Sequence, residues 1–359
     1  MQKNNVRFVD PSKSPFHKVL QKRVNQYFKE NGISRYGNAQ MILKSIVLIS
    51  TYVVPFIIML FFPISWPLSL LLWALMGFGL AGVGMSVMHD ANHGSYSKNK
   101  WVNKFVGASI NLAGGSALTW KLQHNVLHHT YTNVCGMDDD IEDKLFLRFS
   151  PHTDKKWFHK AQAVYAFFFY GITTLYWVTA KDFIQLSKYT KNKVNKQTPK
   201  ENRLALIQMI LVKLAYYAVF FGLPIFVFGI PAFQIITGFL LMHFIAGITL
   251  TTVFQLAHSI EETDHPLPDD NGIIEDNWAM HQIRTTANFS RKSKFLTWYL
   301  GGLNYQIEHH LFPNICHVHY PEIAPIVKKT AEEYQIPYVE HKTFVNALGS
   351  HVGLMNKIA

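Results

Sequence analysis

Four apolar runs, each about as long as a bilayer-spanning helix, constrain the fold of this 359-residue chain more than any other feature. Only residues 63–67 separate the first run from the second, and the last two turn at Pro231. Because backbone groups in lipid must be hydrogen-bonded internally, we expect transmembrane helices. The predicted fold class is all-α and integral to the membrane, with four transmembrane helices in two hairpins over residues 45–62, 68–88, 208–229 and 232–257.

Small and polar residues inside these runs give further expectations. Lys213 lies near one end of the third run, where its long side chain is expected to extend to the interface. His243 lies nearer the middle of the fourth run, where a polar group is costly. Five small residues in the second run predict close helix packing in lipid: Gly77, Gly79, Ala81, Gly82 and Gly84.

The segment 163–180 is also apolar and aromatic, but the lysines around it argue against a fifth span. Lysine and arginine are enriched in residues 1–40 and again in residues 181–203, so both stretches should be cytoplasmic. The first hairpin already returns the chain to that side. We therefore expect 163–180 to lie along the interface as an amphipathic helix, with both termini cytoplasmic. Residues 1–40 form an N-terminal arm, 41–325 the membrane domain and 326–359 a C-terminal tail.

The formal net charge of +11 could indicate nucleic acid as a partner. No nucleic-acid-binding motif accompanies this charge, and the lysines gather at the ends of apolar runs. This placement indicates contact with anionic lipid headgroups instead. We expect membrane lipids, and no nucleic acid, as partners.

Histidines form the strongest chemical signal. The first cluster, His89 and His93, directly follows the second run, and residues four apart on an α-helix share a face. His124 and His128 repeat this spacing, and His129 should point about 100° away along the same helix. The remaining clustered histidines follow or end the fourth run: His258, His309 and His310.

All eight clustered histidines fall on the cytoplasmic face in the predicted topology. Packing the two hairpins side by side would bring them together in a helical cap over the bundle. Imidazole suits Zn, Cu, Fe and Ni, but a catalytic zinc keeps only about three protein ligands. Eight histidines fit two metal ions with open positions, and redox-active iron is the metal that we predict.

The chain resembles the membrane fatty acid desaturases. The words HDANH, HNVLHH and QIEHH match the three histidine boxes of that family in order, and the longer words HNVLHHTYTN and GGLNYQIEHHLFP match as well. The resemblance covers about residues 41–325. The glutamine that opens the third box, Gln306, is similar to the front-end subgroup, which inserts double bonds between an existing one and the carboxyl end.

The resemblance implies a site around two iron ions. Gln306 stands where many relatives have a histidine, so it is a weak ligand or orients one. Asp90 and Asp140 are the preferred partners of the ligand histidines among the nearby acids, which include Asp138, Asp139, Glu142 and Glu308. His281 and Arg284 are candidates for contact with the substrate headgroup. The implied iron ligands are His89, His93, His124, His128, His129, His258, His309 and His310.

The implied reaction is oxygen-dependent insertion of a cis double bond into a fatty acyl chain, carried by coenzyme A or by a membrane lipid and held in a narrow apolar tunnel. No His-Pro-Gly-Gly word of a fused cytochrome-b5-like domain occurs, so we expect a separate electron donor, a ferredoxin or a cytochrome-b5-like protein. We expect a bacterial inner membrane rather than the endoplasmic reticulum. Two alternatives remain: a lipid hydroxylase on the same scaffold and a histidine-rich metal transporter.

Overall fold

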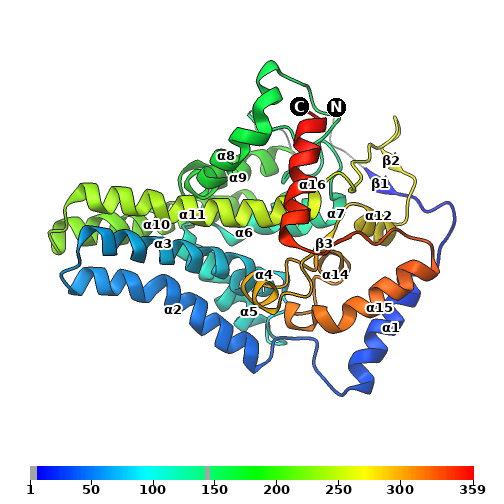
Figure 1. Cartoon of the computed structure of the whole chain (residues 1–359), viewed down its shortest axis with the longest axis horizontal. Helices are drawn as coiled ribbons and strands as arrows, with labels where there is room; N and C mark the ends of the chain where they lie inside the picture. The colour runs from blue at the N-terminus through cyan, green and yellow to red at the C-terminus, as the bar shows by residue number, and fades with distance from the viewer. Residues whose placement is uncertain (1–5, 142–145) are drawn as a thin grey trace.

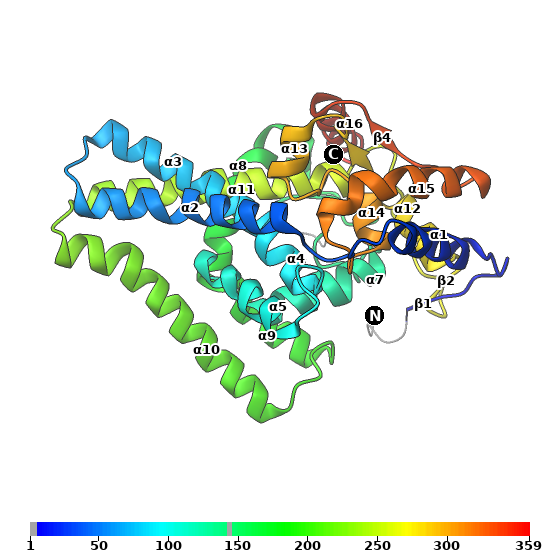
Figure 2. The same ribbon diagram turned by 90° about the horizontal axis from the view of Figure 1, so that it is seen from below.

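The computed structural model describes residues 6–141 and 146–359, and most of them are helical. Long helices extend toward one end of the molecule and short helices gather at the other (Figures 1 and 2). The four long helices are α2 (Ala39–Phe61), α3 (Trp66–Gly82), α10 (Pro199–Tyr217) and α11 (Ala232–His258). The predicted membrane helices are therefore present, in the expected order.

Five helical segments of the described residues, rather than four, are long and apolar enough to cross a membrane. The additional one contains the ambiguous segment 163–180, so length and composition alone leave the number of spans at four or five. Large apolar side chains such as Leu71 and Phe226 are exposed along these helices, as lipid contact requires. The five segments are Ala39–Phe61, Trp66–His93, Trp157–Lys191, Pro199–Val227 and Ala232–His258.

Local sequence signals explain where the long helices begin and change. The Asn38 side chain accepts a hydrogen bond from the Met41 backbone and caps α2, and Thr198 with Glu201 forms a capping box before α10. Two segments continue long helices as π-helix: η1 (Val83–Val87) after α3, and η6 (Ala218–Val227) after α10. Pro224 lies inside η6, where its missing N–H disturbs the α-helical pattern.

The small residues of α3 bring it close to both of its neighbours. A Cβ atom on Gly77 would lie 2.7 Å from the Met242 carbonyl of α11, and one on Gly79 would lie 2.7 Å from the Tyr52 nitrogen of α2. Both positions therefore require glycine. The predicted close packing of this helix is confirmed.

The ambiguous segment forms α8 (Gln162–Tyr176), η5 (Trp177–Lys181) and α9 (Asp182–Lys191). The Thr174 hydroxyl donates to the His243 carbonyl of α11. Lys213 of α10 does not extend to the interface as expected, because its ammonium is buried, 3.0 Å from Asp182 Oδ2. The Asp182 carboxylate and three backbone carbonyls thus accept hydrogen bonds from this ammonium inside the protein. The carbonyls are those of Gly114, Trp177 and Val178.

His243, the other polar residue singled out in the runs, is held by neighbouring hydroxyls. Its ring nitrogens lie 3.0 Å from the Tyr216 hydroxyl and 3.1 Å from the Thr174 hydroxyl. Both nitrogens are therefore satisfied within the bundle. This residue links α8, α10 and α11 rather than joining the histidine clusters.

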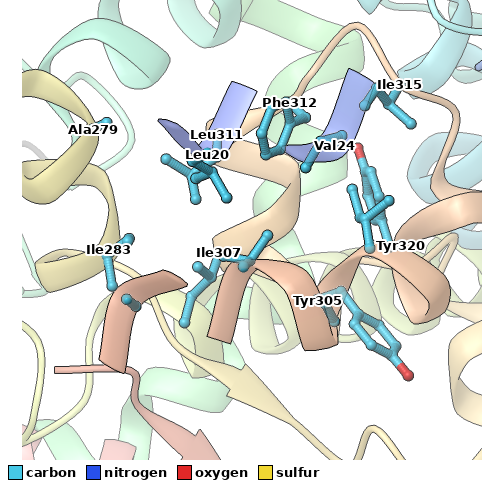
Figure 3. Packing of buried hydrophobic residues seen from close by; sticks show 14 of the residues in the cluster. Leu20, Val24, Ala279, Ile283, Tyr305, Ile307, Leu311, Phe312, Ile315 and Tyr320 are labelled. Atoms are coloured by element: carbon cyan, nitrogen blue, oxygen red, sulfur yellow. The ribbon is translucent and has the colours of Figure 1, made fainter. Parts of the chain in front are cut away.

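The cap is built around one apolar cluster shown in Figure 3. Leu20 and Val24 of α1 (Phe16–Glu30) share it with Leu311 and Phe312. Arg23 joins the same helix to α15 (Tyr320–Glu333), with its guanidinium 2.7 Å from Glu333. In space, the N-terminal arm and the C-terminal tail thus belong to the cap. The other helices of this cluster are α12 (Trp278–Arg284) and α14 (Gln306–Leu311).

The cap also contains four two-residue strands, a small departure from the all-α prediction. They pair in parallel, β1 (Arg7–Phe8) with β2 (Ile273–Ile274) and β3 (Asn288–Phe289) with β4 (Glu340–His341). The remaining short elements are α4 (Met88–His93), α5 (Lys100–Gly107), η2 (Ala108–Ala113), α6 (Ala117–Lys121), η3 (Leu122–His128), α7 (His129–Tyr131), η4 (Trp157–Ala161), α13 (Lys294–Tyr299), η7 (His317–His319) and α16 (Phe344–Lys357).

Candidate metal centre

The first histidine pair lies on α4, which continues the second apolar run past the π-helix η1. The ring centroids of His89 and His93 are 4.7 Å apart, so the two imidazoles lie on one face. α4 ends at Gly94, whose positive φ of 77° suits a helix C-terminus. π-Helical turns of this kind are frequent at functional sites.

The second cluster differs from the expected α-helix, because Leu122–His128 forms the π-helix η3. A π-helix joins residues five apart by hydrogen bonds, so it brings such residues onto neighbouring positions. The His124 and His129 Nε2 atoms are accordingly only 3.3 Å apart. The His124 and His128 rings also stay close, with centroids 5.1 Å apart. All three imidazoles therefore converge, although the sequence predicted that His129 turns away.

The third cluster and the end of α11 complete the site. His309 lies 4.6 Å from His89, and His310 lies 4.3 Å from His129, measured between ring centroids. His258, the last residue of α11, lies 4.6 Å from His128 by the same measure. The structure thus brings all eight predicted histidines together from four separate segments.

Two sets of ligand atoms, each within 4.8 Å of one another, can be distinguished. We call His89, His93, His124 and His309 the first histidine group, and His128, His258 and His310 the second histidine group. His129 lies between them and forms a further set with His309 and His310. The arrangement therefore offers two adjacent places for a metal ion.

The ring nitrogens test whether metal ions fit these places. A buried nitrogen without a partner costs free energy, about 1–3 kcal/mol, unless something binds it. Seven of the eight rings carry such an atom, and imidazole nitrogens are common metal ligands. The donor set therefore fits metal ions. Among the residues that the structure describes, the unpartnered atoms are Nε2 of His93, His128, His258, His309 and His310, and Nδ1 of His89 and His129.

Comparisons with known proteins agree with this geometry. The family model for fatty acid desaturases matches residues 64–342. The chain belongs to the fatty acid desaturase family. It is 36% identical to the sn-1 linoleoyl-lipid 6-desaturase of Arthrospira platensis, over 96% of this chain and 92% of the relative.

Two further relatives extend the comparison. A protein of the same name from Synechocystis sp. is 36% identical over 94% of each chain. The acyl-lipid (8-3)-desaturase of Physcomitrium patens is 37% identical over 99% of this chain and 74% of the relative. The similarity therefore covers nearly the whole chain, and this protein is a fatty acyl desaturase, an oxygen-dependent oxidoreductase.

Several of the eight predicted ligand histidines are anchored through Nδ1, the ring nitrogen opposite the unpartnered Nε2. His128 Nδ1 lies 2.9 Å from Asp138 Oδ2, and His310 Nδ1 lies 2.8 Å from Gln282 Oε1. His258 Nδ1 faces the Thr285 carbonyl at 3.3 Å. Such contacts set the tautomer and the orientation of a metal ligand, leaving Nε2 for the metal.

The two acids preferred from sequence lie near the centre but make longer contacts. Asp140 Oδ2 is 3.7 Å from His124 Nδ1, and Asp90 Oδ1 is 3.7 Å from His89 Nδ1. The main partner of Asp140 is the Gln123 side-chain amide. Asp138, a less favoured candidate, makes the closer contact with a ligand. Glu142, another candidate, lies outside the described residues.

Burial and neighbouring charge favour neutral imidazoles in most of the site. Burial lowers the pKa of His124 to about 3, and burial together with His310 holds the pKa of His129 well below its usual value. Burial acts in the same direction on His128, but Asp138 opposes it and raises the pKa of that ring above the ordinary value. Neutral imidazoles have free lone pairs, so this environment suits a cation.

The remaining predicted residues have distinct positions. Gln306 is buried, and its Oε1 atom has no hydrogen-bond partner among the described residues, which suits a weak ligand. His281 is buried against Phe8, with ring centroids 4.8 Å apart. The Arg284 guanidinium is partly exposed and pairs with Asp276 at 2.7 Å. His281 and Arg284 therefore contact protein groups, and their contact with a headgroup stays a prediction.

Sequence reasoning missed two polar residues that contact the predicted ligand histidines. Gln282 accepts a hydrogen bond from the Thr132 hydroxyl and contacts His310, and the Tyr320 hydroxyl lies 3.2 Å from His309 Nδ1. Gln282 stands inside the family-like word WAMHQIRTTAN, whose histidine and arginine drew attention instead. No spacing signal marks Tyr320, because its role depends on how α15 folds against α14.

Proposed function

We propose that this desaturase uses two iron ions, held by the two histidine groups, to insert a cis double bond into an acyl chain of a membrane lipid. The observation that carries the proposal is the convergence of eight histidines, seven of which carry a buried ring nitrogen without a hydrogen-bond partner among the described residues. Iron would supply the oxidising power, drawn from dioxygen, that breaking unactivated C–H bonds requires. No side chain of the protein can supply it.

The protein's own residues would hold and orient this centre. Asp138, Gln282 and the Thr285 carbonyl fix the rings of the second histidine group. Trp120 covers the first group, with its ring 4.6 Å from His124 between centroids, and so helps to exclude water. Rigid, partly dry surroundings favour a single reaction over oxidative damage.

We propose that an apolar path for the acyl chain begins beside the first box. A small cavity of about 10 Å³ is lined by Val83, Gly84 and Met88, together with Leu250 of α11 and Trp177. Met88 directly precedes His89. The predicted tunnel would follow this lining, and the cavity would widen when a chain enters. Which carbons meet the metal then depends on the depth of this path.

Front-end chemistry and a lipid-linked substrate are supported by the names of the relatives. These include lipid 6-desaturases and an acyl-lipid (8-3)-desaturase. The third box of this chain begins with Gln306, as the front-end resemblance implies. We therefore propose a double bond placed between an existing one and the carboxyl end.

Four spans, with both termini and the metal centre in the cytoplasm, are supported by the position of the histidines. His129 precedes the segment 163–180 and His258 follows it, yet both belong to one site. With α10 and α11 crossing, a third crossing would separate them by the bilayer, about 30 Å. A cysteine at Lys191 should therefore react only with reagents that reach the cytoplasm. Labelling from outside intact cells would contradict this topology.

A separate electron donor completes the proposal. The net charge of +11 favours an acidic ferredoxin or cytochrome-b5-like partner through electrostatic steering. Turnover with such a donor should fall as ionic strength rises. A bacterial inner membrane is the proposed location, in keeping with the two cyanobacterial relatives.

Lipid analysis of cells that express the chain tests the reaction. Mass spectrometry should detect a new double bond on the carboxyl side of an existing one, and purified protein should contain about two irons per chain. Hydroxylated lipids as the main product would favour the hydroxylase. A single zinc per chain would contradict the iron centre, and metal uptake without any lipid change would favour a transporter.

A further inference from the structure

A buried lysine lies at the start of the first membrane helix. Lys44 of α2 is only 3% exposed, and burying an ammonium is costly unless it is paired and hydrogen-bonded. Its Nζ atom lies 2.7 Å from His317 Nε2 and faces the Trp298 ring at 5.5 Å. An ammonium can only donate, so His317 Nε2 is the acceptor. The proton of that neutral imidazole must then be on Nδ1.

The chain of contacts continues to a predicted metal ligand. His317 Nδ1 donates to Asp90 Oδ2 at 2.8 Å, and the His317 backbone N–H donates to the same oxygen at 3.2 Å. The other carboxylate oxygen, Oδ1, lies 3.7 Å from His89 Nδ1. Three segments distant in sequence, α2, η7 and α4, therefore meet in one line that ends at the first histidine group.

The residues around Asp90 do not form a second metal site. Asp90, Cys316 and His317 lie close enough to share an ion, and all three are buried. However, both ring nitrogens of His317 are already occupied, one by Lys44 and the other by Asp90. The lysine also supplies the positive charge that matches the carboxylate. The geometry favours a hydrogen-bonded support over metal binding.

We propose that Lys44 and His317 are positioning residues, which act through Asp90 to keep its carboxylate beside His89 and so help to orient this ring toward iron. The proposal rests on the iron centre proposed above. Two donors from His317 fix Asp90 Oδ2, so Oδ1 stays turned toward His89. Without Lys44, the tautomer of His317 is no longer set, and this orientation is lost.

Iron binding by the purified full-length protein tests the proposal. Lys44→Met removes the donor and keeps the length of the side chain, whereas Lys44→Arg keeps a donor. Changes to outer partners of metal ligands typically cost about 10–100-fold in affinity. Lys44→Met should therefore bind one of the two irons that much more weakly and alter its Mössbauer signal, and Lys44→Arg should restore most of the affinity.

A matched pair of histidines provides the control. His317 and His319 lie on the same short helix and are both buried, but His319 Nε2 contacts the Tyr36 carbonyl instead of Asp90. His317→Leu should weaken the same iron site, whereas His319→Leu should leave iron affinity and the Mössbauer signal unchanged. This comparison separates a role at the metal from the general cost of changing a buried histidine, and it decides the matter if Lys44→Met does not fold.

The outcomes separate the two proposals. Wild-type protein that holds no iron would end the proposed function itself. Wild-type protein with two irons, together with unchanged affinity and signal in Lys44→Met and His317→Leu, would overturn the positioning role alone. Equal losses in His317→Leu and His319→Leu would also overturn it, because the effect would then be structural.

Discussion

The two histidine groups face each other across one site, but they are supported differently. In the second group every ring is buried, and its Nδ1 lies between 2.8 and 3.3 Å from Asp138, Gln282 or the Thr285 carbonyl. In the first group, the carboxylates nearest His89 and His124 lie at 3.7 Å. If both groups hold iron as proposed, the difference predicts one firmly oriented metal position and one that can adjust.

Removal of a ligand from either group should have the largest effect. His128→Ala and His89→Ala should each reduce desaturation to below about 1% of wild type, because a ligand sets both metal affinity and orientation. Membrane insertion should be unchanged, since it depends on the apolar helices. Product analysis in expressing cells measures the loss. His152→Ala is the control, since this side chain lies outside both groups and contacts the His265 carbonyl. Full activity in either ligand variant would remove that residue from the centre.

Substituting Asp138 and Asp140 one at a time sharpens the comparison between the two histidine groups. Asp138→Asn should weaken iron binding by about 10–100-fold, because Asp138 contacts His128 directly and also accepts from the Asn133 backbone. Asp140→Asn should have a smaller effect, since its nearest histidine contacts are 3.7 and 3.8 Å. Chelator competition on purified protein gives both affinities. A larger loss in Asp140→Asn would reverse the assignment of the firm position.

The rate at which a chelator removes iron tests the difference between the two histidine groups without a mutation. The iron of the first histidine group should leave about tenfold faster than the iron of the second, because its ligands have fewer close supporting contacts. Iron content and Mössbauer spectra at successive times should therefore pass through a state with one iron per chain. Simultaneous loss of both irons would show that the two positions are equivalent.

Tyr320→Phe should have the smallest effect. It keeps the aromatic ring in the cap cluster and removes only the hydroxyl that contacts His309 Nδ1. One neutral hydrogen bond contributes about 1 kcal/mol, so iron affinity should fall about fivefold. Chelator competition again measures the affinity, with Tyr334→Phe as the control, since Tyr334 packs against the same apolar cluster. An effect as large as that of Asp138→Asn would mean that His309 is as firmly anchored as the second group.

The sequence predicted the long apolar helices and the histidines that lie together in the cap because both signals are local. Apolar length identifies α2, α3, α10 and α11, and four-residue spacing identifies pairs such as His89 and His93. The meeting of His124 with His129 was not predictable in this way, since it depends on a π-helix that spacing does not reveal. Gln282 and Tyr320 were missed because their roles arise only when α12 and α15 pack against α14.

The same limit applies to charged residues within the membrane helices. Lys213 was expected at the interface because it lies near a run's end, whereas it pairs with Asp182, a residue 31 positions earlier in the chain. Lys44 directly precedes the first predicted span and gave no further signal. The direction of a lysine side chain depends on partners that are distant in sequence, and its position in the sequence does not identify them.

The contact of α1 with α15 sets the order in which this protein can be completed during synthesis. Leu20 and Val24 share their cluster with residues as late as Ile336, and Arg23 pairs with Glu333. The cap can therefore close only after α15 has been synthesised, although α1 is the first helix to leave the ribosome. Closing so long a loop is slow. Until then His309 and His310 are not fixed beside the earlier boxes. With the iron centre proposed above, iron would accordingly be loaded only after the cap has closed.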